Sequence, residues 1–243
     1  MEASISLKSI SKKINQKTLL ADLSFGVETK TTFAIVGANS SGKSTILKLL
    51  CGLIFKDRGS IYIKGMDSGI HPVEIKSIIG YMPQKIDFDD DLNIIENISL
   101  YGELYGLKSD VSYNAALNIC EKLKISTFIK NKISNTPNSI LKIAMFARAV
   151  IHNPEILLLD EPTSNLDIQY REEIWNYINN YCSNKTIVYS THNCKEAENH
   201  SDRIAILHEG SIKYIGNYDY LIENAKGLSQ YKIKCEKIIS ESI

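Results

Sequence analysis

One stretch of the chain has the residue types and the spacing of a loop that binds phosphate groups. It matches the pattern G-x-x-x-x-G-K-[ST] and lies between an apolar run, 33–36, and a predicted helix, 43–53. Its backbone N–H groups can surround phosphate oxygens at the positive end of the helix dipole. Lys43 can reach the outer phosphates, and the Ser44 hydroxyl can bind Mg²⁺. A glycine-rich turn that contains a lysine by chance is the alternative, and the flanking strand and helix favour phosphate binding. The residues assigned to phosphate binding are Gly37, Ala38, Asn39, Ser40, Ser41, Gly42, Lys43, Ser44 and Thr45.

Two adjacent carboxylates follow a second apolar run, 156–159. Open α/β sheets bind ligands at the carboxyl ends of their strands, so Asp160 and Glu161 lie at a favourable place. Because side chains alternate along a strand, the two acids have different roles. Asp160 suits Mg²⁺, whereas Glu161 is placed to polarise a water molecule that attacks a terminal phosphate. A solvated acidic strand end is the alternative, and the upstream phosphate loop weakens it.

His192 follows a third predicted strand, 186–189, where its ring could hydrogen-bond a terminal phosphate. Taken alone, it would more often be a structural histidine. The remaining histidines are interpreted as surface or structural residues. The scattered cysteines lack metal-ligand spacing and are interpreted as reduced thiols. These residues are His71, His152, His200 and His208, and Cys51, Cys120, Cys182, Cys194 and Cys235.

The elements that position these residues alternate between strand and helix. Predicted strands at 33–36, 78–82, 156–159 and 186–189, with a helix at 168–181, predict a parallel sheet. Alternating apolar residues near 5–7 and 23–27 predict antiparallel strands, and 204–207 with 212–215 predict a hairpin. Between 85 and 151 the apolar spacing is helical, with a last helix at 138–150, which indicates an inserted helical subdomain.

The composition restricts the classes of function. Lys plus Arg and Asp plus Glu both number 28, so no bulk field draws the chain to nucleic acid or anionic lipid. No apolar run approaches the roughly 20 residues that cross a bilayer, and residues 1–13 lack the apolar segment of a signal peptide. We therefore expect a cytosolic chain without direct membrane insertion.

The motifs together resemble, in order and spacing, the nucleotide-binding domain of ATP-binding-cassette proteins over nearly the whole chain. The resemblance adds a Q-loop residue, Gln84, and a D-loop, 164–167, that ends at Asp167. It implies an Mg²⁺-dependent ATPase with ATP bound at the phosphate loop and Asp167. The implied Mg²⁺ ligands are Ser44, Gln84 and Asp160, and the implied catalytic residues are Glu161, His192 and Gln84.

The implied fold class is α/β, a RecA-like P-loop core with a parallel sheet, an N-terminal antiparallel β-subdomain and an inserted helical subdomain. We expect a single domain over 1–243. Its core would comprise 1–84 and 152–225, its helical subdomain 85–151, and a C-terminal extension 226–243.

Shorter segments, such as 79–84 and 104–107, look like those of drug or antibiotic-peptide exporter ATPases. This similarity implies a homodimer or heterodimer of cassette subunits that drives separate membrane subunits at the inner face of the cell membrane. The membrane partner is expected to dock near 85–107, beside an acidic, flexible segment, 87–91. The alternatives are a soluble cassette ATPase of the assembly-factor type and an ATP-binding regulatory subunit with weak turnover. Six intact reaction residues argue for turnover.

Two positions depart from the family pattern. The signature Leu-Ser-Gly-Gly-Gln is replaced at 136–140 by Thr-Pro-Asn-Ser-Ile, so Pro137 stands where a serine contacts the opposing subunit's γ-phosphate. We expect Thr136 to be the N-cap of the following helix and Pro137 its first residue. Ile14 stands at the position of an adenine-stacking aromatic, which puts adenine affinity in doubt.

Overall fold

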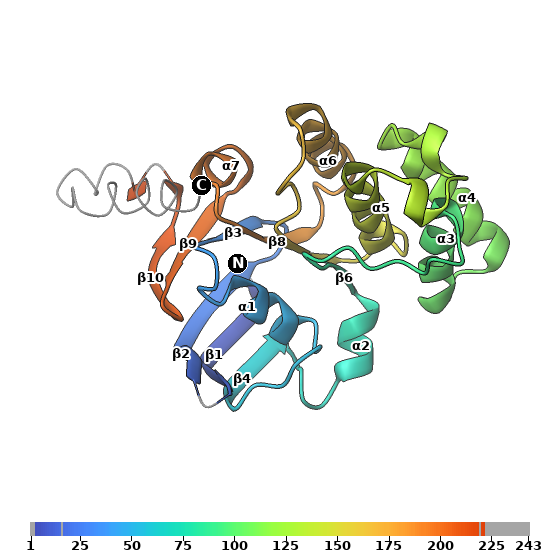
Figure 1. Ribbon diagram of the computed structural model, residues 1–243. Coiled ribbons are helices and arrows are strands. Elements are labelled where there is room, and N and C mark those ends of the chain that lie inside the picture. The colour runs from blue at the N-terminus through green and yellow to red at the C-terminus, as the bar shows by residue number, and fades with distance from the viewer. Residues whose placement is uncertain (1–2, 16, 219, 222–243) are drawn as a thin grey trace. The chain divides into compact units, whose positions relative to one another are not determined.

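The computed structural model describes residues 3–15, 17–218, 220 and 221 of the chain (Figure 1). These residues form two compact units. The first comprises the described residues up to Ile75 and from Thr186 onward, and the second comprises Lys76–Lys185. The expected boundaries after residues 84 and 151 stay predictions, and the expected extension 226–243 lies outside the described residues.

An antiparallel sheet begins the first unit. Its strands follow the order β2-β1-β4-β5, with bounds Lys17–Glu28, Ala3–Ile14, Arg58–Ile63 and Met66–Asp67. Ile5 pairs with Val27 on one side and with Ile63 on the other, and all three side chains are buried. This alternation buries one face of the sheet, as the sequence predicted for the first two strands. The sequence pattern did not predict β4 and β5.

A second set of strands in the first unit carries the phosphate-loop sequence. Strand β3 (Thr32–Val36) pairs in parallel with both β8 (Thr186–Thr191) and β9 (Arg203–His208), and β10 (Ser211–Gly216) pairs antiparallel with β9. The β3 run is apolar throughout because it has a strand on each side and packed residues on both faces. Helix α1 (Lys43–Leu50) follows β3, and α7 (Cys194–His200) follows β8.

The second unit joins a parallel strand pair to a group of helices. Strand β6 (Ile79–Met82) pairs in parallel with β7 (Ile156–Asp160). The helices are α3 (Ile94–Leu104), α4 (Ser109–Lys122), α5 (Asn138–Val150) and α6 (Ile168–Tyr181), with 3₁₀ turns at Ser126–Phe128 and Ile133–Asn135. Helix α2 (Pro72–Ser77) lies at the sequence boundary between the units.

Helix α5 is buried on every side. Every residue from Ile140 to Val150 is buried, including Lys142 and Arg148. A helix surrounded in this way is a core element rather than a surface helix. The buried charged side chains of α5 must therefore find polar partners inside the unit.

The predicted fold class is confirmed, with an antiparallel N-terminal sheet, mostly parallel central strands and a helical region. One boundary was wrong, because α1 ends at Leu50 rather than at residue 53. Gly52 adopts a φ of 67°, and the N–H of Leu53 returns to the carbonyl of Lys48 at 2.9 Å, which closes the helix. None of the helices in the described part of the chain is long and apolar enough to cross a membrane.

Candidate functional site

The loop after β3 is shaped by close approach of the backbone at its two glycines. A Cβ at Gly37 would lie 2.4 Å from the Leu207 carbonyl oxygen, and one at Gly42 would lie 2.8 Å from a Leu20 methyl group. Gly42 also has a φ of 108°, and Ser40 has a φ of 63°. Glycine is therefore required at both positions of the pattern, for space at the first and for space and backbone conformation at the second.

Lys43 is folded into this loop. Its side chain is 5% exposed, and its Nζ donates to the carbonyl oxygens of Gly37 at 2.8 Å and Ala38 at 3.0 Å. Helix α1 begins here with Gly42 as N-cap and without a side-chain capping bond, so its first N–H groups point into the loop's end. An ammonium beside a helix N-terminus is a favourable environment for an anion.

His192 lies beside the start of the same loop. Val36 pairs with Thr191, and the N–H of Gly37 donates to the Thr191 carbonyl at 3.3 Å, so the residue after Thr191 emerges next to the loop. Asn193 fixes the following turn, because its side chain caps α7 by accepting from the N–H groups of Lys195 and Glu196. The His192 side chain is exposed. The structure thus brings the predicted histidine and the phosphate loop together.

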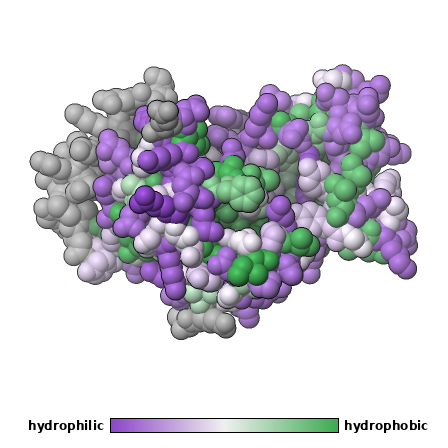
Figure 2. Space-filling view, turned by 90° about the horizontal axis from the view of Figure 1, so that it is seen from below, coloured by the Kyte–Doolittle hydropathy of each residue, from purple (hydrophilic) through white to green (hydrophobic). Residues whose placement is uncertain are grey.

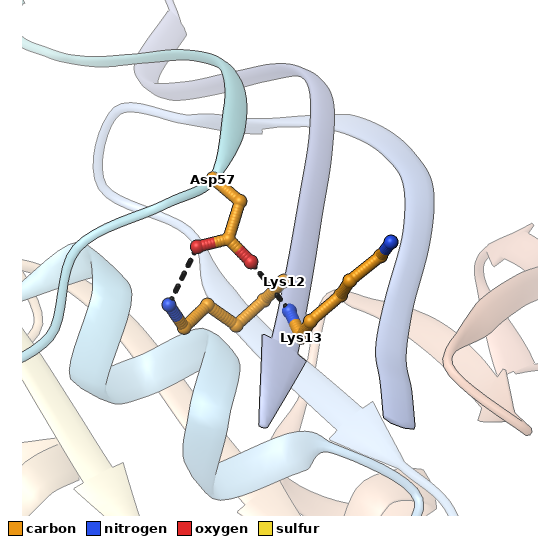
Figure 3. Close-up of polar contacts among 3 residues, drawn as sticks. All are labelled: Lys12, Lys13 and Asp57. Carbon is orange, nitrogen blue, oxygen red and sulfur yellow. Dashed lines mark hydrogen bonds and ion pairs between the residues drawn. The ribbon is translucent and has the colours of Figure 1, made fainter. Parts of the chain in front are cut away.

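The end of the β1–β2 pair at which the two strands connect also lies near the loop. Lys12 pairs with Leu20, whose side chain approaches Gly42, and Ile14 follows two residues later with 46% of its side chain exposed. Asp57 fastens this strand end by accepting from Lys12 Nζ at 2.8 Å and from the N–H of Lys13 at 2.6 Å (Figure 3). Both contacts lower the pKa of Asp57, the Lys12 contact more strongly.

In the second unit, the predicted acids and the Q-loop residue lie at the same end of two paired strands. Met82 pairs with Leu159, so Gln84 and Asp160 both lie just past that pair. Asp160 is 1% exposed and Glu161 is 4% exposed, whereas Gln84 is exposed. The sequence placed these residues correctly at the carboxyl ends of neighbouring strands. The Glu161 backbone has a φ of 51°, which the sequence did not predict.

The D-loop residues form the turn between β7 and α6. Leu166 is buried, and Asp167 is exposed and precedes α6 as its N-cap residue without a side-chain capping bond. Arg171 holds the end of this turn, since its Nε donates to the Leu166 carbonyl at 2.6 Å and its N–H donates to the Asp167 carbonyl at 3.1 Å. The backbone at Asp167 is therefore held in place at the start of α6.

The signature-equivalent helix does not begin with the expected cap. Pro137 has a ψ of 142° and is the N-cap residue of α5, and the first helical bond runs from the N–H of Leu141 to its carbonyl. Thr136 cannot cap the helix, because its hydroxyl donates to the Lys132 carbonyl at 2.8 Å. The helix thus begins at Asn138, the start expected from the apolar spacing, and the expected cap at Thr136 was wrong.

Sequence patterns missed Lys142, which contacts the D-loop. Its Nζ donates to the Ser164 carbonyl oxygen at 2.7 Å. A lysine at this spacing usually lies on a solvated helix face. The available signal was the apolar character of nearly all its neighbours in α5, which indicates burial on every side.

A comparison with known protein families shows which family has these motifs. The family model described as "ABC transporter" matches residues 20–164, from β2 through the phosphate loop and the Asp160-Glu161 pair to Ser164. The chain belongs to the ABC transporter family. Within this family it is an ATP-binding subunit with a P-loop ATPase fold.

Relatives and solved structures agree with this assignment. The chain is similar to the Nod factor export ATP-binding protein I of Burkholderia lata, with 29% identity over 95% of this chain and 76% of the relative. It is also 30% identical to the linearmycin resistance ATP-binding protein LnrL of Bacillus subtilis, over 86% of this chain and 68% of the relative. A dimeric ATP-binding cassette solved with ADP and Pi superposes with a TM-score of 0.80 at 24% identity, over 88% of this chain and 98% of that one, and shows the shared fold.

Proposed function

We propose that this ABC subunit hydrolyses ATP to drive an exporter whose membrane subunits are separate chains. The observation that carries the proposal is the phosphate loop, in which Lys43 is folded inward and α1 begins without a side-chain cap. The two relatives described above are named for Nod factor export and for linearmycin resistance, which favours an exporter over an assembly factor.

Oxygen donors of the kind that Mg²⁺ prefers occur at the proposed positions. Asp160 offers a carboxylate that is 1% exposed at the end of β7, and Ser44 offers a hydroxyl in the first turn of α1. Gln84 would add an amide oxygen. When bound, Mg²⁺ would supply positive charge to the phosphate oxygens.

The chain's own residues would divide the remaining work of hydrolysis. The loop N–H groups and Lys43 would hold the phosphates, with the ammonium exchanging its carbonyl partners for phosphate oxygens. Glu161 would accept the proton of the attacking water, and His192 and Gln84 would orient the reacting groups by hydrogen bonds. Asp167, at the corner before α6, would lie beside the nucleotide of the opposing subunit.

A dimer of cassettes is the arrangement that this chemistry requires, and the solved cassette above is dimeric. In a homodimer of this chain, each nucleotide would meet a helix that starts with Pro137 and Asn138 rather than with serine and glycine. Each lost charge-assisted hydrogen bond costs roughly 1.5–3 kcal/mol, so both sites would close weakly. We therefore favour a heterodimer with a related cassette that has an intact signature. A homodimer in which the partly exposed Ser139 substitutes for the missing serine is the alternative.

The membrane partner is proposed to dock on the region 85–107. The support comes from the residues that are exposed there rather than from the apolar composition of the segment. Ile94, Ile95 and Ile98 are buried inside the second unit and cannot form the dock. Leu104 is 70% exposed and Tyr105 is 40% exposed at the end of α3, and the carboxylates of 87–91 are near the surface. Apolar patches also interrupt the hydrophilic surface in Figure 2. The exposed end of α3 is therefore the part of 85–107 that remains available.

Nucleotide binding by a Lys43→Ala variant tests the proposed function. We expect affinity for Mg-ATP to fall at least about 10-fold, because the variant loses a buried cation that faces the phosphates. Lys48→Ala is the matched control, since Lys48 belongs to the same helix but is exposed. Equal ATP affinity in wild type and Lys43→Ala, measured by titration calorimetry, would remove the basis of the proposal.

A further inference from the structure

The backbone at Glu161 is strained. This residue follows β7 directly, its side chain is 4% exposed, and its φ is 51°. A residue with a Cβ adopts this left-handed conformation only when the surrounding structure fixes it. Four residues later, Asn165 also has a positive φ, of 59°. The direction of the Glu161 side chain thus depends on whatever holds the segment 161–165.

Ser164 holds the Glu161 carbonyl twice. The N–H of Ser164 donates to the Glu161 carbonyl oxygen at 3.2 Å, and the Ser164 hydroxyl donates to the same oxygen at 3.0 Å. A peptide carbonyl fixed by two donors cannot rotate without losing both bonds. The left-handed conformation of Glu161 is therefore locked from its C-terminal side.

Lys142 holds Ser164 in turn. From the middle of α5, its Nζ donates to the Ser164 carbonyl at 2.7 Å and to the Ser164 Oγ at 2.5 Å. Because Lys142 donates to Oγ, the hydroxyl proton is directed away from the ammonium and toward the Glu161 carbonyl. A cationic donor also polarises the hydroxyl and strengthens the bond that the hydroxyl makes.

The burial of Lys142 is costly. Its side chain is 7% exposed, so folding removes a strongly hydrated ammonium from water and orders a long flexible stem. A methionine of similar length would pack in the same place without that cost. Packing alone therefore does not explain why a lysine occupies this position, whereas its hydrogen bonds to Ser164 do.

We propose that Lys142 is a positioning residue for Glu161, acting through Ser164. The proposal rests on the proposed role of Glu161 as the base in ATP hydrolysis. All three residues belong to the second unit, and Lys142 lies one helical turn after the start of α5. The helix that begins with the altered signature segment is thus bonded to the turn that carries the base.

Steady-state ATP hydrolysis by the chain with its membrane subunits and a related cassette that has an intact signature tests the proposal. Lys142→Met keeps the length and the packing but removes the donor. We expect kcat to fall roughly 10- to 100-fold with KM for ATP changed less than about twofold, because the phosphate contacts are untouched. Lys142→Arg, which retains the charge and donors, should recover most of kcat. The matched control is Lys124→Met, which removes an exposed ammonium that bonds Glu173 at 2.7 Å in the same unit.

Ser164→Ala provides a second variant if Lys142→Met does not fold. It should lower kcat similarly, and adding Lys142→Met to it should lower kcat little further, since both act through one chain of bonds. A Lys142→Met or Ser164→Ala kcat within twofold of wild type, while Glu161→Gln is inactive, would overturn this proposal alone. A wild-type chain without turnover in that assembly would overturn the proposed function instead, whereas a Glu161→Gln variant with normal turnover would remove only the role of Glu161 on which this proposal rests.

Discussion

At the scale of single residues, the site depends on backbone conformations that most residues avoid. Gly42 and Ser40 give the phosphate loop its turn with positive φ values, and Glu161 has one at the end of β7. The conformation at Gly42 could be predicted, because glycine spacing is visible in a sequence. The strain at Glu161 could not, because nothing in the residue type indicates a left-handed conformation. The contact of Lys142 could not be predicted either, because its partner Ser164 lies 22 residues away along the chain.

Glu161→Gln tests the role of that strained residue. The amide keeps the size of the side chain but cannot accept the proton of the attacking water, so we expect ATP turnover to fall roughly 10²- to 10⁴-fold. ATP affinity should change little, because the phosphate loop is intact. Turnover and nucleotide binding are measured on the same preparation. Near-normal turnover would move the role of the base elsewhere, with His192 as the first candidate.

At the scale of elements, the segment between β6 and α3 is held by side-chain hydrogen bonds to its backbone rather than by regular secondary structure. Arg148 on α5 donates to the Asp87 carbonyl, and its guanidinium lies 3.5 Å from the centre of the Tyr101 ring and 4.9 Å from that of Phe88. Asn97 on α3 accepts from the N–H of Asp89 and donates to its carbonyl, both at 2.9 Å. The segment 87–91, which was expected to be flexible, is therefore held at Asp87 and Asp89 by side chains of α5 and α3. Its acidic composition gave no indication of the two buried side chains that fasten it.

His152 provides a pH-dependent contact between elements of the second unit. Its ring stacks on Tyr105 with centroids 3.6 Å apart, and its Nε2 lies 3.2 Å from the Ile79 carbonyl oxygen. Burial lowers the pKa of His152 to about 4 from its ordinary value of 6.5, because the cationic form is poorly solvated there. The folded protein therefore binds a proton less readily than the unfolded chain does.

The sign of the effect on stability follows from this lowered pKa. The neutral ring contributes fully above about pH 6.5, and the contribution is lost as the pH falls toward 4. Between pH 7 and pH 5, we expect wild type to lose roughly 1–2 kcal/mol more unfolding free energy than His152→Phe, since solvent screens part of the effect at a half-buried ring. Denaturant unfolding at both pH values measures this difference, with the exposed histidine variant His192→Phe as control. Equal losses in wild type and His152→Phe would show that folding does not lower the pKa of this ring.

The sequence predicted most elements because each has a strong local pattern. The parallel strands are continuous apolar runs, and the bounds of α5 and α6 match the helices expected at 138–150 and 168–181. Strand β4 was missed because its sequence, RGSIYI, has a short and incomplete alternation beside a glycine. The end of α1 was misplaced because the apolar spacing continues past Gly52, and the positive φ of Gly52 ends the helix there.

At the scale of the whole molecule, the sequence matches the family pattern in one set of the residues proposed to bind nucleotide and departs from it in the other. The phosphate loop, Asp160 and Glu161 match that pattern, whereas α5 begins with Pro137 and Asn138 in place of the family signature. In the proposed dimer, two cassettes share each nucleotide. The altered start of α5 therefore affects nucleotide binding only when the dimer forms. A related cassette with an intact signature would complete the site that is built on this chain's phosphate loop.

The most direct test of the central claim is ATP turnover by the chain purified together with its membrane subunits, with and without a related cassette protein. The account predicts Mg²⁺-dependent turnover that Lys43→Ala removes, that is low with the membrane subunits alone and that rises when the related cassette is added. Robust turnover without the second cassette, lost in Ser139→Ala, would contradict the heterodimer. Turnover that is the same in wild type and Lys43→Ala would contradict the claim that this chain is the ATP-hydrolysing subunit.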